Sequence, residues 1–359
     1  MDKRLKKRGP SRAARVDFAT YAGVTLAYAV MMILQAGGLV SRSLAGQLVP
    51  ICCYVVMALS LNLTVGILGE LSLGHAGFMS VGAFTGIVVS AQLADAAASV
   101  PLRLALALLA GALAAAAAGF VVGIPVLRLH GDYLAIVTLA FGEILKELIG
   151  CLLVGIDERG LHVLFNAKGD RQAADLGLSE SGRVIIKGAQ GAVDTETIAS
   201  FTAGFLLIMV TLFIILNLIR SRAGRAIMAV RDNRIAAESL GVSPVRYKLM
   251  AFVLSAALAG SAGALYGLNF SSLSASKFSF NQSILVLVFV VLGGLGCMWG
   301  SILSAVVLTI LPEALRQLED YRMLIYAVVL IVVMLATNSR ALHTLRERVR
   351  PGKREEDRP

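Results

Sequence analysis

The stretch that decides the fold runs from Arg220 to Phe270, RSRAGRAIMAVRDNRIAAESLGVSPVRYKLMAFVLSAALAGSAGALYGLNF. Residues 220–248 are polar and carry seven basic side chains against two acidic ones, whereas residues 249–270 form an apolar run. An apolar run of about 20 residues is long enough to cross a bilayer as a helix. A short basic loop beside such a span lies on the cytoplasmic side by the positive-inside rule. The stretch therefore predicts a membrane protein with residues 220–248 in the cytoplasm.

The basic loop also shows helical periodicity. Four of its side chains fall on one face of a helix: Ile227, Arg231, Arg234 and Glu238. Arg234 and Glu238 stand at the i,i+4 spacing that allows an ion pair. Gly241 and Pro244 then end the helix and turn the chain. Composition alone leaves two interpretations open: a solvated loop whose arginines only set the topology, or a short helix displayed for a cytoplasmic partner.

The overall composition agrees with a membrane protein. Hydrophobic residues make up 57% of the chain and charged residues 16%, whereas a soluble domain carries about 25% charged residues. The net charge of +10 is concentrated near the two ends of the chain and in the 220–248 loop. Such clustering is a pattern of membrane topology rather than of a binding groove, so we exclude nucleic acid as a partner.

Apolar runs predict an all-α polytopic transmembrane bundle. The candidate spans are 18–39, 45–67, 71–93, 102–127, 133–155, 201–219, 249–270, 283–315 and 322–337. Glycines break the 283–315 run at Gly293, Gly294, Gly296 and Gly300, which predicts either two half-helices or a re-entrant pair. The bundle therefore has about 8–10 spans. An even number agrees with two basic cytoplasmic tails, 1–17 and 339–359, on either side of a membrane domain at 18–338.

The longest polar excursion, residues 156–200, is expected outside the cell membrane. It holds seven acidic and five basic residues, so its net charge is opposite to that of the 220–248 loop. Two interpretations stay open for it: contact with an extracytoplasmic partner, or a disordered loop.

Several small residues have the spacing of close helix packing. Three glycine pairs follow the G-x-x-x-G pattern: Gly82 and Gly86, Gly119 and Gly123, and Gly263 and Gly267. In lipid, close backbone approach through small residues takes over much of the packing that the hydrophobic effect provides in water. The pairs predict packing within this chain or, alternatively, contact with a second membrane subunit.

Four polar side chains lie in or beside the predicted spans: Asn62, Glu70, His75 and Glu143. An ionisable group near the bilayer centre costs at least ~2.5 kcal/mol, so these residues are candidates for lining a substrate path. A structural alternative exists for each type. Lys146 lies within reach of Glu143 and can neutralise it. Asn62 and His75 can bond backbone groups freed where the glycines of residues 66–86 break a helix.

No pattern of enzyme chemistry is present in the sequence. The phosphate loop G-x-x-x-x-G-K-[ST] is missing, so this chain is not expected to hydrolyse ATP itself. We find no metal-ligand spacing and no nucleophile–base pair, and therefore predict no catalytic residue, metal or cofactor in this chain. Three of the four cysteines lie inside apolar runs and are read as core residues.

Four stretches together resemble a known family. They are LSLNLTVGILGELSLGHAGFMSVGAF (59–84), PVLRLHGDYLAIVTLAFGEI (125–144), AAESLGVSPVRYKLMAFVLSAALAGSAGALYG (236–267) and VVLGGLGCMWGSILSAVVLTILPEALR (290–316). They are similar, in the same order, to the M-type permease subunits of ABC importers for branched-chain amino acids. Two departures stand out: no Thr-Gly-Gly element follows residues 142–144, and the chain reads ATNSRAL where the family tends to show Pro-Gln-Gly-Leu.

The resemblance implies a set of partners and roles. A permease of this family works in the bacterial inner membrane with a homologous second permease, two cytoplasmic ATPase subunits that bind the ATP, and an extracytoplasmic substrate-binding protein. It also implies that Arg231, Arg234 and Glu238 contact the ATPase and that Gly241 and Pro244 fix the shape of the 220–248 coupling loop. The implied substrate is a branched-chain or other hydrophobic amino acid.

Three alternatives remain open from the sequence. An ion-gradient-coupled secondary transporter would use Glu70, His75 and Glu143 as coupling groups. A permease of the same general kind could instead carry urea or short amides. A structural membrane scaffold would transport nothing.

Overall fold

The computed structural model describes residues 12–38, 41–94, 99–129, 131–157, 160–166, 176, 182–315, 324, 327, 328 and 331. The chain divides into two units, residues 1–306 and residues 307–359. The first unit holds most of the described elements, and the second begins within the last long helix. Most of the predicted span 322–337, tail residues 1–11 and the tail 339–359 lie outside the described residues.

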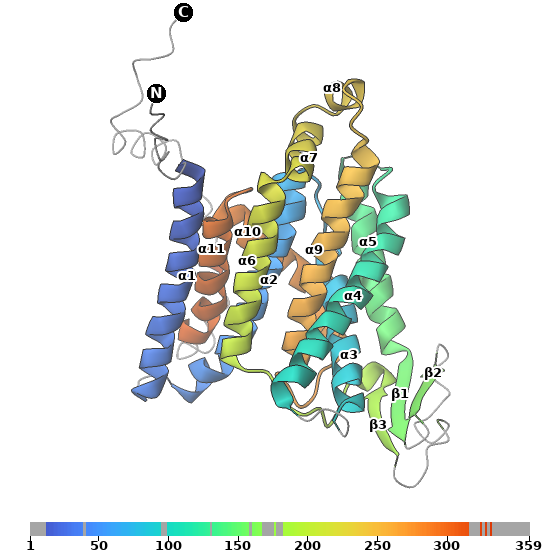
Figure 1. Ribbon diagram of the computed structural model, residues 1–359. Helices are drawn as coiled ribbons and strands as arrows, with labels where there is room; N and C mark the ends of the chain where they lie inside the picture. Colours follow the sequence, from blue (N-terminus) through green and yellow to red (C-terminus); the bar gives the residue numbers. More distant parts are fainter. Residues whose placement is uncertain are drawn as a thin grey trace, which may run out of the picture. The chain divides into compact units, whose positions relative to one another are not determined.

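Helices dominate the described chain (Figure 1). The long ones are α1 (Arg12–Ala36), α2 (Arg42–Asn62), α3 (His75–Gln92), α4 (Val100–Val126), α5 (Asp132–Gly150), α6 (Phe201–Arg220), α9 (Pro244–Gly267), α10 (Phe280–Gly293) and α11 (Met298–Ala314). Among the described residues, five helices are long and apolar enough to cross a membrane: α1, α2 with the π-helical turn that follows it, α4, α6 and α9. The prediction of a polytopic helical bundle is confirmed.

The glycine break in the 283–315 run is confirmed as well. Here α10 ends at Gly293 and α11 begins at Met298, and both helices are shorter than a full span. Gly294 and Gly296 in the connection adopt φ of 92° and 79°, a left-handed conformation that favours glycine. The glycines therefore separate two helices of 14 and 17 residues, each shorter than a typical span of about 20 residues.

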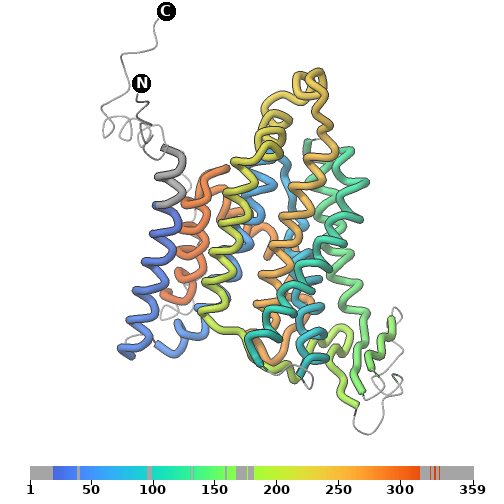
Figure 2. Tube along the Cα trace, viewed as in Figure 1, coloured from blue at the N-terminus to red at the C-terminus, as the bar shows by residue number. Residues whose placement is uncertain are grey.

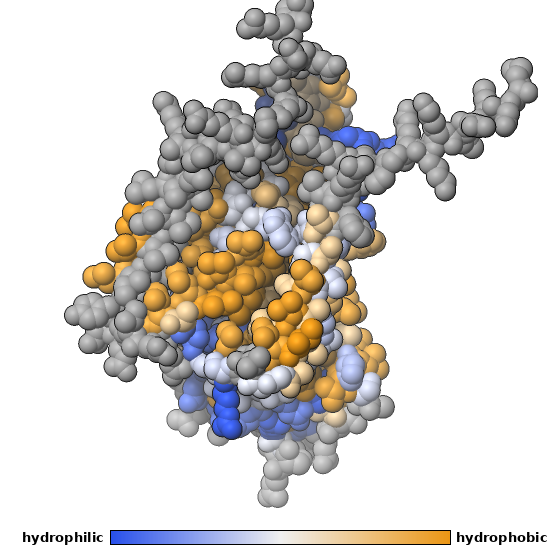
Figure 3. All heavy atoms as spheres, turned by 90° about the vertical axis from the view of Figure 1, so that its left-hand side faces the viewer, coloured by the Kyte–Doolittle hydropathy of each residue, from blue (hydrophilic) through white to orange (hydrophobic). Residues whose placement is uncertain are grey.

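Apolar side chains cover the surface of the bundle where a soluble protein would be polar. Figure 3 shows a broad hydrophobic band on the face that Figure 1 presents at its left, with hydrophilic side chains gathered below it. On α1, the helix at that side, Leu26 and Ile33 are 67% and 70% exposed. A continuous exposed apolar band of this kind is a surface for lipid or for another membrane subunit.

Helices α3, α4 and α9 make the most extensive helix contacts and approach one another through small residues, while α2 is the most deeply buried of the described spans. A Cβ added at Gly82 would collide with the backbone of Gly260, and one at Gly263 would collide with the backbone of Met79. Gly119 lies against Ala256 of α9 in the same way. The glycine pairs therefore pack within this chain, which was the first of the two predictions for them.

The excursion at 156–200 contains a structure that the sequence did not predict. Strand β1 (Leu152–Asp157) pairs in antiparallel fashion with β2 (Gly160–Phe165) and β3 (Arg183–Lys187), giving the order β2-β1-β3. The predicted span 133–155 is accordingly too long: α5 ends at Gly150, and residues 152–155 belong to β1. A short apolar run fits a strand as well as a helix, and here pairing with β2 and β3 decides between them.

Two short helices and the sheet lie at opposite ends of the first unit. Helix α6 leads into α7 (Arg222–Asp232) and α8 (Arg234–Ser239), and the chain returns as α9 (Figure 2). The strands lie at the other end of these helices (Figure 1). This arrangement agrees with the prediction that the basic loop and the acidic excursion face different sides of the membrane.

The helix contacts generate a stability prediction. Gly82→Ala places a methyl group against the backbone of Gly260, so we expect it to lower the stability by about 1–3 kcal/mol. The matched control is Gly46→Ala in α2, where nothing lies within 4 Å of the added Cβ. Thermal unfolding of the two variants in detergent measures the difference. Equal melting temperatures would show that the α3–α9 contact is looser than the structure indicates.

Candidate functional site

The basic loop folds into two helices rather than one. The Ser221 hydroxyl accepts a hydrogen bond from the Gly224 amide at 3.1 Å and caps α7. Asn233 has an extended backbone, with φ −154° and ψ 103°, and its side chain accepts from the Ala236 amide at 3.0 Å to cap α8. Because Asn233 breaks the helix, the predicted single face of Ile227, Arg231, Arg234 and Glu238 is wrong.

The end of the loop follows the sequence prediction. Gly241 follows Leu240, the C-cap residue of α8, with φ +81°, and Pro244 occupies the first turn of α9. Proline is favoured at that position because the first helical amides lack a partner within the helix. These two residues therefore turn the chain from α8 back into the bundle.

Helix α8 presents a mixed apolar and charged surface. Ile235 and Leu240 are 80% and 84% exposed. Beside them, Arg234 Nε donates to Glu238 Oε1 at 3.0 Å, the predicted i,i+4 pair. The exposure of Ile235 and Leu240 was not predicted from the sequence. Two large apolar residues in a polar loop outside any span could have indicated a contact surface.

Arg231 points in a different direction, toward the membrane bundle. Its Nη1 donates to the Gly66 carbonyl at 3.1 Å, and its Nε and Nη2 donate to Asp232 Oδ1 at 3.0 and 2.9 Å. The aliphatic part of the side chain covers Gly69, where an added Cβ would lie 2.6 Å from Arg231 Cγ. Arg231 therefore joins α7 to the segment that follows α2.

The segment that Arg231 contacts is an unusual turn. Residues Leu63–Leu68 continue α2 as a π-helical turn, and Gly69 ends it with φ +80°. A π-helical turn is rare and often marks a functional position in a helix. We refer to residues 66–70, at the end of this element, as the 66–70 turn.

A buried ion pair also links the 66–70 turn to α9. The Lys248 ammonium contacts the Glu70 carboxylate, and the two side chains are only 8% and 14% exposed. Lys248 lies in the second turn of α9, just after the loop, whereas Arg231 lies before α8. The two ends of the α8 excursion are thus both bonded to the 66–70 turn.

Asn62 connects this region to the break between α10 and α11. Its Oδ1 accepts from the Gly296 amide at 2.8 Å, and its Nδ2 donates to Ser301 Oγ at 3.0 Å. Asn62 is fully buried, and a Cβ on the neighbouring Gly66 would collide with both Asn62 and Gly296. Asn62 therefore bonds a freed backbone group, but at the break between α10 and α11 rather than within the glycine-rich stretch 66–86, where the sequence predicted the break.

His75 behaves differently from that prediction. Its Nε2 shares a hydrogen bond of 2.8 Å with the Ser60 hydroxyl, and the side chain is 2% exposed. It therefore bonds a side chain of α2 rather than a freed backbone group.

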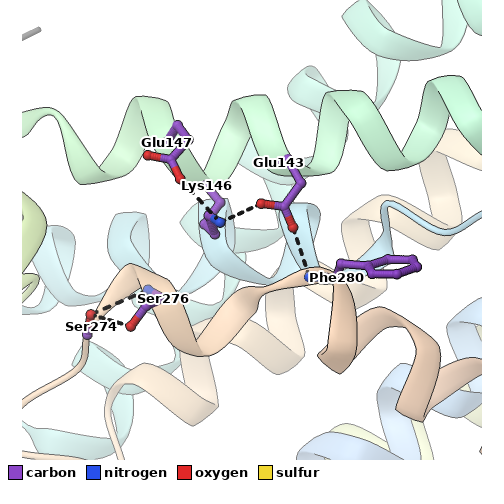
Figure 4. Close-up of polar contacts among 6 residues, drawn as sticks. All are labelled: Glu143, Lys146, Glu147, Ser274, Ser276 and Phe280. Carbon is purple, nitrogen blue, oxygen red and sulfur yellow. Dashed lines mark hydrogen bonds and ion pairs between the residues drawn. The ribbon is translucent and has the colours of Figure 1, made fainter.

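Glu143 joins α5 to the start of α10 (Figure 4). Lys146 forms ion pairs with Glu143 and, at 3.2 Å, with Glu147, so the predicted neutralisation of Glu143 is confirmed. The other carboxylate oxygen of Glu143 accepts from the Phe280 amide at 2.8 Å. An acceptor at that position satisfies one of the unpaired amides at the beginning of α10.

The chain matches a known family model over most of its length. The model described as "Branched-chain amino acid transport system / permease component" matches residues 43–334. No solved structure matches the chain.

Two curated relatives point the same way. The high-affinity branched-chain amino acid transport system permease proteins LivM of Escherichia coli (strain K12) and of Salmonella typhimurium (strain LT2) are each 37% identical over 288 residues. The match covers 79% of this chain and 66% of each relative, just under two thirds of the relatives' length. The chain therefore belongs to the family of permease components of branched-chain amino acid transport systems.

Proposed function

We propose that this chain is the membrane-spanning permease subunit of an ATP-driven importer for branched-chain or other hydrophobic amino acids. Family membership and the helical bundle support this function. Separate cytoplasmic subunits would bind and hydrolyse the ATP. The observation that carries the proposal is the exposed helix α8, displayed beyond the bundle by a loop that the positive-inside rule assigns to the cytoplasm.

The surface of α8 fits a protein partner. Ile235 in α8 and Leu240 at its C-cap are both exposed apolar side chains, and Arg234 and Glu238 beside them in the sequence are charged. Exposed apolar side chains among polar ones are typical of a protein interface. We assign this surface, termed the α8 surface, to contact with the ATPase subunit.

The paired charges favour this function over an ion-gradient-coupled transporter. Such a transporter needs a group that gains and loses an ion during each cycle. Here Glu70 is paired with Lys248, Glu143 is paired with Lys146, and His75 is buried against Ser60. Each of the three candidate coupling groups is engaged in a structural contact.

The remaining partners follow from the family assignment and the two ends of the bundle. A homologous second permease would complete the transport path, with lipid covering the rest of the apolar surface. A substrate-binding protein would contact the end that carries β1, β2 and β3. In this arrangement the protein lies in the bacterial inner membrane with both termini in the cytoplasm.

We further propose that the 66–70 turn transmits movement of the ATPase to the helical bundle, and we call it the proposed joint. A push on α8 reaches this turn by two routes: through Arg231 to the Gly66 carbonyl and through Lys248 to Glu70. Asn62 and the packing of Gly66 on Gly296 extend the contact to the break between α10 and α11. A contiguous set of bonded and packed groups of this kind can carry energetic coupling between sites.

The α8 surface generates a direct test of the function. Leu240→Asp replaces an exposed apolar side chain of the α8 surface with a charge, so we expect at least a tenfold loss of ATPase recovered with the tagged permease from native membranes. Because Leu240 is 84% exposed, the fold should be unaffected. The control is Val163→Asp on β2, 54% exposed at the other end of the bundle.

The outcomes of that pull-down separate two conclusions. An unmodified chain that never recovers an ATPase would overturn the ATP-driven function itself. Normal recovery with Leu240→Asp would keep the function and move the docking surface away from α8.

Arg231 tests the proposed joint. Arg231→Gln removes the charged donor to the Gly66 carbonyl but leaves the α8 surface intact, so ATPase binding should persist. We expect amino-acid uptake per ATP hydrolysed to fall about tenfold, the equivalent of 1.4 kcal/mol of coupling. Arg225→Gln, an exposed position on the same helix, is the matched control. An unchanged ratio of uptake to hydrolysis in the reconstituted complex would rule out Arg231 as a coupling residue.

The Glu70–Lys248 pair gives a charge-reversal test. Glu70→Gln leaves a buried ammonium without its counter-ion, which we expect to destabilise the protein by about 3 kcal/mol. The double variant Glu70→Lys with Lys248→Glu should recover much of that loss, because an ion pair is restored. Thermal unfolding in detergent measures both. A double variant no more stable than the single one would contradict a direct pair.

A further inference from the structure

A polar cavity lies at the end of the bundle that carries the sheet. Its volume is about 440 Å³, within the range of small-molecule sites. The walls come from the end of α3, the first turn of α4, strands β1 and β3, residues 193–196, and Leu268 just after α9. Asp194, Glu196 and Arg183 are exposed at its edge, so the cavity is open to solvent.

One wall of the cavity holds a buried cation. The side chain of Arg103 is 8% exposed, its Nε donates to Ser90 Oγ at 3.0 Å, and its Nη2 pairs with the Glu196 carboxylate. Arg103 also lies in the first turn of α4, where the helix dipole disfavours a positive charge. The position of this arginine, almost out of water and in the first turn of a helix, is therefore costly for its charge.

The counter-ion of Arg103 is unevenly placed. Glu196 is 54% exposed, whereas Arg103 is almost fully buried. A carboxylate that is half in water can leave the arginine at low cost, because water solvates it once it moves away. Another carboxylate can therefore take its place on the planar guanidinium, which suits two-pronged binding of that group.

The other walls supply an anion and an apolar surface. Asp194 has φ +53°, an uncommon conformation for a residue other than glycine, and such conformations gather at binding sites. The following residue is fixed: Thr195 donates from its hydroxyl to the Phe270 carbonyl at 2.5 Å. Ile87, Ile156 and Val193 add branched aliphatic side chains to the lining.

We propose that this cavity is a binding site for a zwitterionic α-amino acid with an aliphatic side chain, whose carboxylate displaces Glu196 on Arg103. The ammonium group faces Asp194, and the side chain lies on the apolar wall. This assignment rests on the proposed function. It gives the permease a site of its own for the substrate, at the end opposite the α8 surface.

The two charged residues give predictions of opposite sign. The complete importer in lipid nanodiscs, without its extracytoplasmic binding protein, is titrated with radiolabelled leucine. Arg103→Gln should weaken leucine binding at least tenfold, because the carboxylate loses its partner. Glu196→Gln should tighten leucine binding severalfold, because the competing carboxylate is removed. Lys187→Gln, an exposed basic residue of β3 that does not line the cavity, should change nothing.

Leucine analogues test the two ends of the ligand. Leucinamide lacks the carboxylate and 4-methylpentanoate lacks the ammonium group, so neither should compete with leucine. Arg103→Lys keeps the charge and controls for misfolding, and it should bind more leucine than Arg103→Gln. A purely structural Arg103–Glu196 pair predicts instead that both neutral variants melt at a lower temperature with leucine binding unchanged, and that result overturns the site.

The experiment also keeps this site separate from the proposed function. Uptake driven by ATP, and ATPase recovery with the permease, test the function without reference to the cavity. An importer that takes up leucine normally but shows no leucine binding that depends on Arg103 overturns the cavity site alone.

Discussion

The structure depends on backbone contact between α3, α4 and α9. Lipid gives these helices no hydrophobic reason to associate, so their stability comes from packing at short range. Gly82 against Gly260 and Gly263 against Met79 bring the backbones together at distances that exclude a Cβ. Interfaces of this kind do not deform continuously, because any separation leaves a void. The three helices therefore form a closely packed block within the first unit, and the other elements join it at its edges.

The charged contacts lie at those edges. Glu70–Lys248 and Arg231–Gly66 bond the α8 excursion to the end of α2, and Glu143 bonds α5 to the start of α10. The Glu70 and Lys248 side chains are 14% and 8% exposed, so little water competes for that pair, whereas the Arg231 side chain is 40% exposed. Polar side chains that the sequence marked as candidates for a substrate path thus serve, in this conformation, to join helices. This explains how the chain carries intramembrane charge without leaving it unpaired at these positions.

Sequence periodicity predicted the helices because apolar length and glycine breaks are local properties. It also predicted the Lys146–Glu143 and Arg234–Glu238 pairs, in which the partners are neighbours on one helix. It missed Lys248 as the partner of Glu70, since the two residues stand 178 positions apart and only the fold brings them together. The sheet was not predicted for a related reason. Strand β1 is a short apolar run, and whether such a run forms a strand or a helix depends on the segments with which it pairs. Asn233 could have been predicted as a helix N-cap, since asparagine is favoured at that position. The helical periodicity continues across Asn233, however, and therefore indicated one helix instead of two.

Helix α9 connects the two ends of the first unit. It begins at Pro244, directly after the α8 excursion, and ends at Gly267, one residue before Leu268 in the cavity wall. Helices α3 and α4 pack on α9 and supply Ser90 and Arg103 at the same cavity. The segment that carries Glu196 is also held to α9, because Thr195, Ile198 and Ala199 are hydrogen-bonded to residues 268–271 directly after that helix. Both members of the Arg103–Glu196 pair therefore belong to elements that are joined to α9.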